Sequence, residues 1–152
     1  MNLLCQCFSD SDILEAAAQV MEKRISYGPV FDSPSAVKEF LRFKIGAEAR
    51  EHFMVVFLTS QHALISAEIM FSGTLSQTSV YPREVVRRAL ELNAAAVLLA
   101  HNHPSGMAEP SRADEHLTQT LKSALTLIDV RVLDHIVVGA NSTVSFAERG
   151  LL

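Results

Sequence analysis

One apolar run, residues 94–100, constrains the fold more than any other segment. It reads AAAVLLA without a polar side chain. A strand with one face in water alternates apolar and polar residues, whereas a strand covered on both faces is apolar throughout. Helical patterns stand on both sides of the run, from Pro82 to about Asn93 and from Ser111 to Ile128. The run therefore predicts an α/β domain in which helices cover both faces of a central sheet.

The other segments fit this architecture. We expect helices over residues 12–26 and 33–46, with Ser33 as the N-cap and Pro34 in the first position of the second helix. Strands are expected over 53–58, 64–71, 130–138 and 143–146, the first two joined antiparallel through residues 60–62. The first helix should present one apolar side, formed by Ile13, Ala16, Ala17, Val20 and Met21. These elements predict a mixed sheet in a three-layer α/β sandwich.

Two histidines, His101 and His103, follow directly from the apolar run. On an extended backbone they point to the same side, because side chains alternate with period two, and Asn102 points away. Asp114 follows after ten intervening residues. Two imidazoles and a carboxylate form the N/O ligand set of a catalytic zinc site, which keeps its fourth position for water. Ser111 and Asp114 also match a capping box at the start of a helix.

The spacing His-x-His-x10-Asp, with Ser three residues before the Asp, resembles the JAMM (MPN-plus) metalloprotease signature. The segments SVYPREVVRRALELNAAAVLLAHNHPSG, DVRVLDHIVVG and VSFAERG are similar to the bacterial RadC family, a JAMM branch. The similarity covers roughly Pro34 to Leu152. It implies a cytidine-deaminase-like JAMM fold over 33–152, preceded by an N-terminal helical extension over 1–32. That extension is expected to be too short for the helix-hairpin-helix segment that bacterial members usually carry.

The resemblance also implies a chemistry. Zn²⁺ would be held by His101, His103 and Asp114, and would lower the pKa of a bound water toward neutrality. A carboxylate must then accept a proton from this water and pass it on. The JAMM pattern places that glutamate near the start of an upstream strand, where Glu51 stands, and Glu68 in the next strand is the rival. Ser111 resembles the serine that stabilises the oxyanion, although N-capping alone also explains it.

The charge of the chain bears on whether it binds nucleic acid. The net charge is −4, whereas a chain that mainly holds a phosphate backbone is usually basic. Strong direct binding of DNA is therefore not expected, and Arg83, Arg87 and Arg88 are the candidate basic patch, or else a solvated helix face. The two cysteines, Cys5 and Cys7, form no disulfide framework, which favours a reducing cytoplasm. No apolar run approaches the roughly 20 residues that span a bilayer, and the first residues lack a basic leader.

Three functions stay open at this point. The leading one is a zinc-dependent hydrolase of the metallopeptidase or isopeptidase type. Its substrate would be a peptide or an amide, including one within a protein. The second is a non-enzymatic DNA repair or replication accessory protein that retains a metal site. The third is an interaction domain in which zinc is structural. Structural zinc sites normally use cysteine ligands, which this motif lacks. Cytidine deaminase chemistry is excluded because its Pro-Cys-x-x-Cys motif is absent. His135 is expected in the core or beside the ligands, and His52, His62 and His116 at the surface or rim.

Overall fold

The computed structural model describes residues 9–27, 33–73 and 79–152. Cys5 and Cys7 lie outside these residues, as do Gly28 and Pro29, whose dipeptide is expected to end the first helix. The elements are, in chain order, α1 (Asp10–Tyr27), α2 (Pro34–Ile45), β1 (His52–Leu58), β2 (Leu64–Ser72), α3 (Pro82–Glu91), β3 (Ala96–Asn102), α4 (Arg112–Thr126), β4 (Arg131–Val138) and β5 (Thr143–Ser145). Every predicted element is present within a few residues of its expected bounds.

The five strands form one mixed sheet in the order β2-β1-β3-β4-β5. β1 runs antiparallel to both β2 and β3, β3 runs parallel to β4, and β5 returns antiparallel to β4. The crossover from β3 to β4 passes through α4, as a parallel pair requires. The mixed sheet and the antiparallel β1–β2 hairpin are confirmed.

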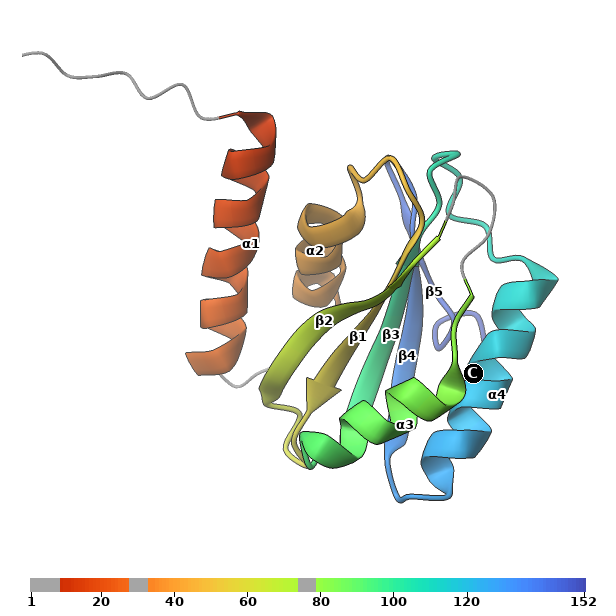
Figure 1. Cartoon of the computed structure of the whole chain (residues 1–152). Coiled ribbons are helices and arrows are strands. Elements are labelled where there is room, and N and C mark those ends of the chain that lie inside the picture. Colours follow the sequence, from red (N-terminus) through yellow and green to blue (C-terminus); the bar gives the residue numbers. More distant parts are fainter. Residues whose placement is uncertain (1–8, 28–32, 74–78) are drawn as a thin grey trace, which may run out of the picture.

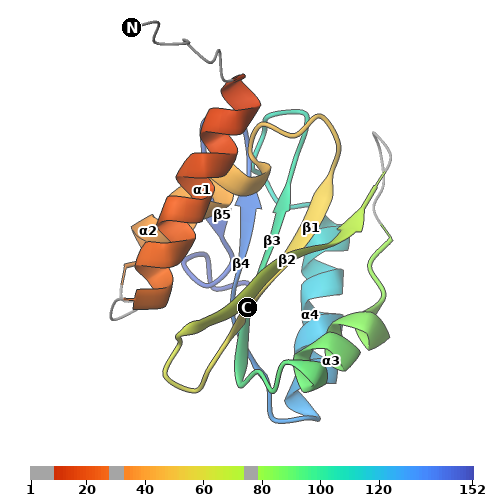
Figure 2. The ribbon, with the colours of Figure 1, turned by 60° about the vertical axis from the view of Figure 1, so that its left-hand side comes forward.

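Helices cover both faces of the sheet, with α1 and α2 on one side and α3 and α4 on the other (Figures 1 and 2). β1 shows how the sequence divides its side chains between the two layers. Met54, Val56 and Leu58 pack in the core beneath α2, whereas Phe53, Val55 and Phe57 pack beneath α3 and α4. β3 is buried along its whole length, which confirms the expectation from the apolar run. The three-layer α/β fold is therefore confirmed.

The inward face of α1 differs from the predicted one. Ile13 and Val20 are 56% and 51% exposed, whereas Ala18 is fully buried and Met21 packs against the core of α2 and the sheet. α1 packs mainly on α2 and also contacts β2, at the edge of the sheet (Figure 2). An outer helix of this kind needs only a narrow apolar stripe, so the broader pattern in the sequence did not identify the buried side.

Ser33 occupies the N-cap position of α2, with Pro34 in the first turn as expected. Its side chain, however, makes no cap hydrogen bond, and its hydroxyl lies 2.6 Å from that of Ser35. The capping role expected for the Ser33 side chain is therefore wrong. Within the described ranges, no helix has the length and apolar character needed to cross a membrane.

Candidate metal centre

The structure brings together the three predicted ligands at the end of β3 and the start of α4. The Nε2 atoms of His101 and His103 lie 2.9 Å apart, and those atoms lie 3.4 and 3.6 Å from the carboxylate oxygens of Asp114. The three ligand atoms all lie within 4.8 Å of one another, so this group can hold a metal ion. The side chain of His101 is 2% exposed, whereas those of His103 and Asp114 are 19% and 14% exposed. The centre is therefore open toward solvent on the side of His103 and Asp114.

A tight loop carries the chain from His103 toward α4. The His103 N–H donates to Val138 O at 2.9 Å, and the Gly106 N–H donates back to His103 O at 2.9 Å. Gly106 has a φ of +85°, a conformation that residues with a Cβ rarely adopt and that this turn requires. Gly106 O accepts from the Ala140 N–H at 3.0 Å. The loop between the ligands is thus tied to the end of β4 at two points.

Asp114 is held by the helix that it starts. The Ser111 N–H and hydroxyl both donate to Asp114 Oδ2, at 2.7 and 2.6 Å, and the Asp114 N–H donates to Ser111 Oγ at 3.2 Å. The capping box is therefore confirmed. Burial raises the pKa of Asp114, but the neighbouring His101 and His103 and the hydrogen bond from Ser111 outweigh burial and hold that pKa far below its usual range. The carboxylate is ionised and oriented toward the imidazoles. The second role expected of Ser111, at the oxyanion, stays a prediction.

The hydrogen bonds of His103 show which of its nitrogens is available. His103 Nδ1 lies 2.8 Å from Met107 O. A carbonyl can only accept, so Nδ1 carries a proton, and Nε2 is the ring nitrogen that faces His101 and Asp114. Asp114 raises the pKa of His103, and the charge of Glu51 adds to this. Two ring nitrogens and an anionic oxygen around one point favour a cation there, and this N/O set is one that zinc accepts.

His101 is backed by a second buried histidine. His135 is fully buried, and its Nε2 lies 2.8 Å from His101 Nδ1. Its Nδ1 lies 2.6 Å from Oγ1 of Thr118, a buried residue of α4. Burial and the neighbouring His101 lower the pKa of His135 well below its usual value. The ring is fully buried between Phe53 and Phe146, a setting that favours its neutral form. The expected place of His135 is confirmed. Thr118 could not be singled out from the sequence, because a lone threonine in an amphipathic helix carries no motif.

Asn102, between the two ligand histidines, binds the chain that leads into β1. It is buried, and its Oδ1 accepts from the His52 N–H at 2.7 Å. Its Nδ2 donates to Arg50 O at 2.8 Å and to Glu48 O at 3.3 Å. β1 pairs with β3 antiparallel with Phe53 opposite His101, so continuing that register by two residues sets Glu51 opposite His103. One amide side chain thus holds the segment that carries Glu51 against the metal-ligand strand.

The rival glutamate, Glu68, has a different partner. Its carboxylate accepts from Arg88 of α3 at 2.7 and 2.9 Å and from the Ser66 hydroxyl at 2.7 Å. Hydrogen bonding by Arg88 lowers the pKa of Glu68. The carboxylate of Glu68 is therefore already paired with the guanidinium group of Arg88.

We expect Asn102→Ala to destabilise the protein by about 2–4 kcal/mol, because three hydrogen bonds worth about 0.5–1.5 kcal/mol each are lost and their backbone partners stay partly buried. Chemical denaturation of the metal-free protein measures this cost. Asn141→Ala, at an exposed position of the β4–β5 turn, is the matched control and should stay within about 0.5 kcal/mol of wild type. An equally small cost for Asn102→Ala would contradict this role of its amide.

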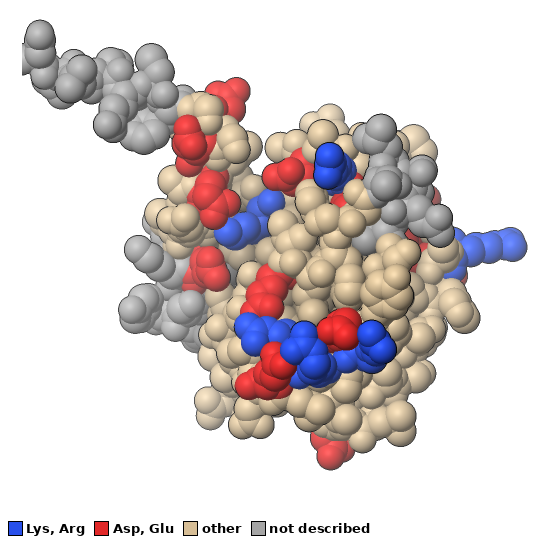
Figure 3. Space-filling model, viewed as in Figure 1, with Lys and Arg blue, Asp and Glu red and all other residues tan. Residues whose placement is uncertain are grey.

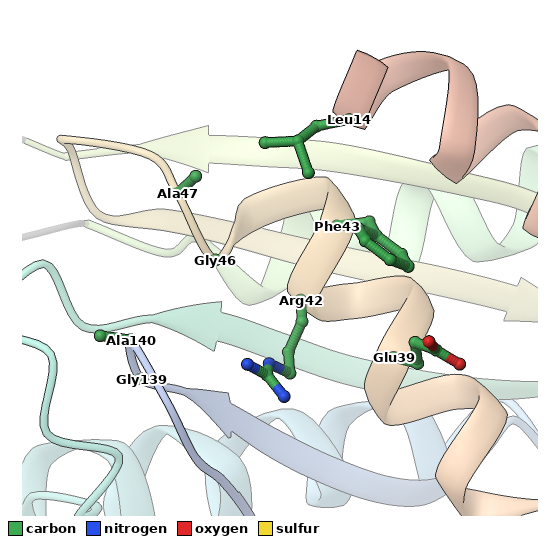
Figure 4. A pocket seen from close by; sticks show the side chains of 8 residues that line it. All are labelled: Leu14, Glu39, Arg42, Phe43, Gly46, Ala47, Gly139 and Ala140. Atoms are coloured by element: carbon green, nitrogen blue, oxygen red, sulfur yellow. The ribbon is translucent and has the colours of Figure 1, made fainter. Parts of the chain in front are cut away.

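A separate cavity of about 490 Å³ lies on the opposite side of the sheet, between α1, α2 and the end of β4. Phe43 and Leu14 form apolar walls, and Arg42 and Glu39 of α2 project beside them (Figure 4). None of the three ligand residues lines it. This cavity and the metal centre are therefore distinct features of the molecule.

Known proteins resemble this chain over most of its length. The chain is 64% identical to a UPF0758 protein of Leptothrix cholodnii over 140 residues, which cover 92% of this chain and 63% of the relative. UPF0758 proteins of Methylibium petroleiphilum and Nitrosomonas eutropha are 62% and 56% identical over the same length, and cover 63% and 62% of those proteins. The chain thus spans less than two thirds of the length of these relatives.

The family model described as "RadC-like JAB domain" matches residues 31–151, a range that contains all five strands, α2 to α4 and the three clustered ligand residues. The match thus includes both the sheet and the helix that together build the metal centre. By this match, the chain belongs to the RadC-like JAB domain family.

Proposed function

We propose that this protein is a zinc-dependent hydrolase of amide bonds, of the metallopeptidase or isopeptidase type. The observation that carries the proposal is the open cluster of His101, His103 and Asp114. Structural zinc sites are closed and rich in cysteine, whereas catalytic ones use three N/O ligands and leave one position open. The described cluster contains no cysteine and is exposed on one side, which favours the catalytic type.

In this proposal each residue has one task. Zinc, when bound, would act as a Lewis acid and make a bound water acidic near pH 7. His101, His103 and Asp114 would hold the ion, each with its ligand atom already directed inward. Glu51, just before β1, would accept a proton from the water and donate it to the leaving amine. The Ser111 N–H would keep Asp114 oriented, while the Ser111 hydroxyl would turn away from Asp114 and donate a hydrogen bond to the oxyanion.

Zinc removal and restoration test the activity. The zinc-loaded protein is incubated with a panel of fluorogenic peptides, small amides and isopeptide-linked substrates. We expect hydrolysis of at least one class, its loss after removal of zinc by a chelator, and its return when zinc is added back. Hydrolysis that persists in the metal-free protein, or a zinc-loaded protein that hydrolyses none of the panel, would contradict the proposal.

The candidate basic patch on α3 supports the hydrolase over the DNA accessory protein. Arg87 pairs with Glu84 at 3.1 Å and with Glu91. Arg88 pairs with Glu68 at 2.7 Å and with Glu91 at 3.1 Å. Figure 3 shows acidic side chains placed between the arginines along this face. A phosphate backbone would have to compete with carboxylates that already neutralise these guanidinium groups.

We therefore expect this chain to bind duplex DNA weakly and without sequence preference at physiological salt. Non-specific affinity depends on the number of phosphates neutralised and falls steeply with salt, and few cations here are available. Fluorescence anisotropy with a labelled duplex, at low and at physiological salt, measures it. Tight binding that is lost in an Arg87→Ala, Arg88→Ala double variant would favour the accessory role instead.

A further inference from the structure

A chain of hydrogen bonds runs from α4 through the core to the metal centre. The Thr118 hydroxyl lies 2.6 Å from Asp114 O and 2.6 Å from His135 Nδ1, and His135 Nε2 lies 2.8 Å from His101 Nδ1. Thr118, His135 and His101 are all buried. His135 is packed between Phe53 and Phe146, whose ring centroids lie 5.6 and 4.7 Å from its own. Because these three side chains are shut off from water, the positions of their protons are set by the donors and acceptors within this series of hydrogen bonds.

The proton of Thr118 decides the direction of the whole chain. A backbone carbonyl can only accept, so the single hydroxyl proton of Thr118 points to Asp114 O. Thr118 Oγ1 can then only accept from His135, which places the His135 proton on Nδ1. The neutral ring has one bare nitrogen, Nε2, and this nitrogen accepts from His101 Nδ1–H. The proton of His101 is thereby kept away from Nε2, the atom that faces His103 and Asp114.

From this geometry we infer that Thr118 and His135 are positioning residues that fix His101 in the Nδ1–H tautomer and so leave its Nε2 as a ready metal ligand. This inference rests on the metal site of the proposed function and deepens it. His103 also carries a proton on Nδ1, which it donates to Met107 O at 2.8 Å. Partners of this kind commonly set the affinity of a metal site, and their loss costs roughly 10–100-fold.

Thr118→Val tests the inference, because valine keeps the shape of threonine and lacks the hydroxyl. Without an acceptor at Thr118, nothing holds the His135 proton on Nδ1. If that proton moves to Nε2, it donates to His101 Nδ1 and drives the His101 proton onto the ligand nitrogen. We expect the zinc affinity of Thr118→Val, measured by competition with a chromophoric chelator, to fall roughly 10–100-fold. Thr118→Ser restores the hydroxyl and should bind zinc within about threefold of wild type.

Thr120 offers a matched control on the same helix. Its hydroxyl donates to His116 O at 2.9 Å, the same bond to the carbonyl four residues earlier, on the exposed side of α4. Thr120→Val should leave zinc affinity unchanged. A general weakening of α4 would lower zinc affinity in both valine variants, whereas loss of the hydrogen bonds from Thr118 through His135 to His101 lowers it in Thr118→Val alone. Equal affinities in wild type and Thr118→Val, or no rescue by Thr118→Ser, would overturn the role of Thr118.

The tautomers themselves can be read without zinc. Imidazole ¹⁵N shifts in the metal-free wild-type protein distinguish a protonated nitrogen from a bare one. We expect protonated Nδ1 and bare Nε2 at His101 and His135, and a proton shifted toward Nε2 at both in Thr118→Val. A protonated His101 Nε2 in the neutral wild-type ring would overturn the inference even if a variant failed to fold. A wild-type protein that has the expected tautomers but binds no zinc would contradict the proposed function. It would leave the hydrogen-bond order through Thr118, His135 and His101 supported.

Discussion

Glu51→Gln should retain zinc and fold while hydrolysis of the substrate found in the panel falls roughly 10²–10⁴-fold, the usual contribution of general acid–base catalysis. Glutamine is close to glutamate in shape but cannot accept the proton of the attacking water. The antiparallel pairing of β1 with β3 sets this residue opposite His103. Steady-state kinetics, with zinc content measured on the same samples, provide the test.

Glu68→Gln is the matched control for this experiment, since Glu68 stands in the neighbouring strand and is occupied by Arg88. We expect it to keep near wild-type activity and to lose at most about 1 kcal/mol of stability, because the ion pair is partly exposed. An inactive Glu68→Gln beside an active Glu51→Gln would reverse the assignment of the base.

Purified wild-type protein should contain one zinc ion per chain, and His103→Ala should lose it. Removing a ligand leaves two of the three protein ligands, so the loss of affinity should exceed the roughly 10–100-fold expected for a residue that only supports a ligand. Elemental analysis after dialysis against a weak chelator measures the metal content directly.

His116→Ala serves as the control for a histidine on the adjoining helix, because His116 is exposed on α4 and lies outside the ligand group. It should keep a full complement of zinc. Equal zinc in His103→Ala and wild type would contradict the ligand assignment, whatever the activity of either protein.

The fold was predictable because the spacing of apolar residues along the sequence distinguishes its helices from its strands. β3 is apolar from Ala96 to Ala100 and is covered on both faces, and Pro34, Pro82 and Ser111 mark helix starts by local chemistry. α1 shows the limit of such patterns. Ile13 and Val20 belong to its apolar stripe yet point to solvent, because the buried side of an outer helix depends on where its neighbour lies.

The three candidate ligands could be named from sequence for a related reason. His101 and His103 are neighbours on a strand, and Asp114 follows within a short loop, so chain connectivity alone brings them near one another. The choice between Glu51 and Glu68 could not be made that way, since Glu51 stands just before one strand and Glu68 within the next, both at ordinary places. The pairing of β1 with β3 and the ion pair of Glu68 with Arg88 support the proposal of Glu51, and both arise only when distant segments pack.

Tertiary structure alone revealed the support behind the ligands. Thr118, His135 and His101 come from α4, β4 and β3, and 34 residues separate the two histidines in the chain. Single polar residues of this kind form no periodic pattern, so the sequence does not predict that they meet. Once buried, each must find a partner, because a polar atom shut off from water needs one inside the protein. Local chemistry therefore sufficed to name the candidate metal ligands, whereas the proposed order of their protons depends on how the segments pack together.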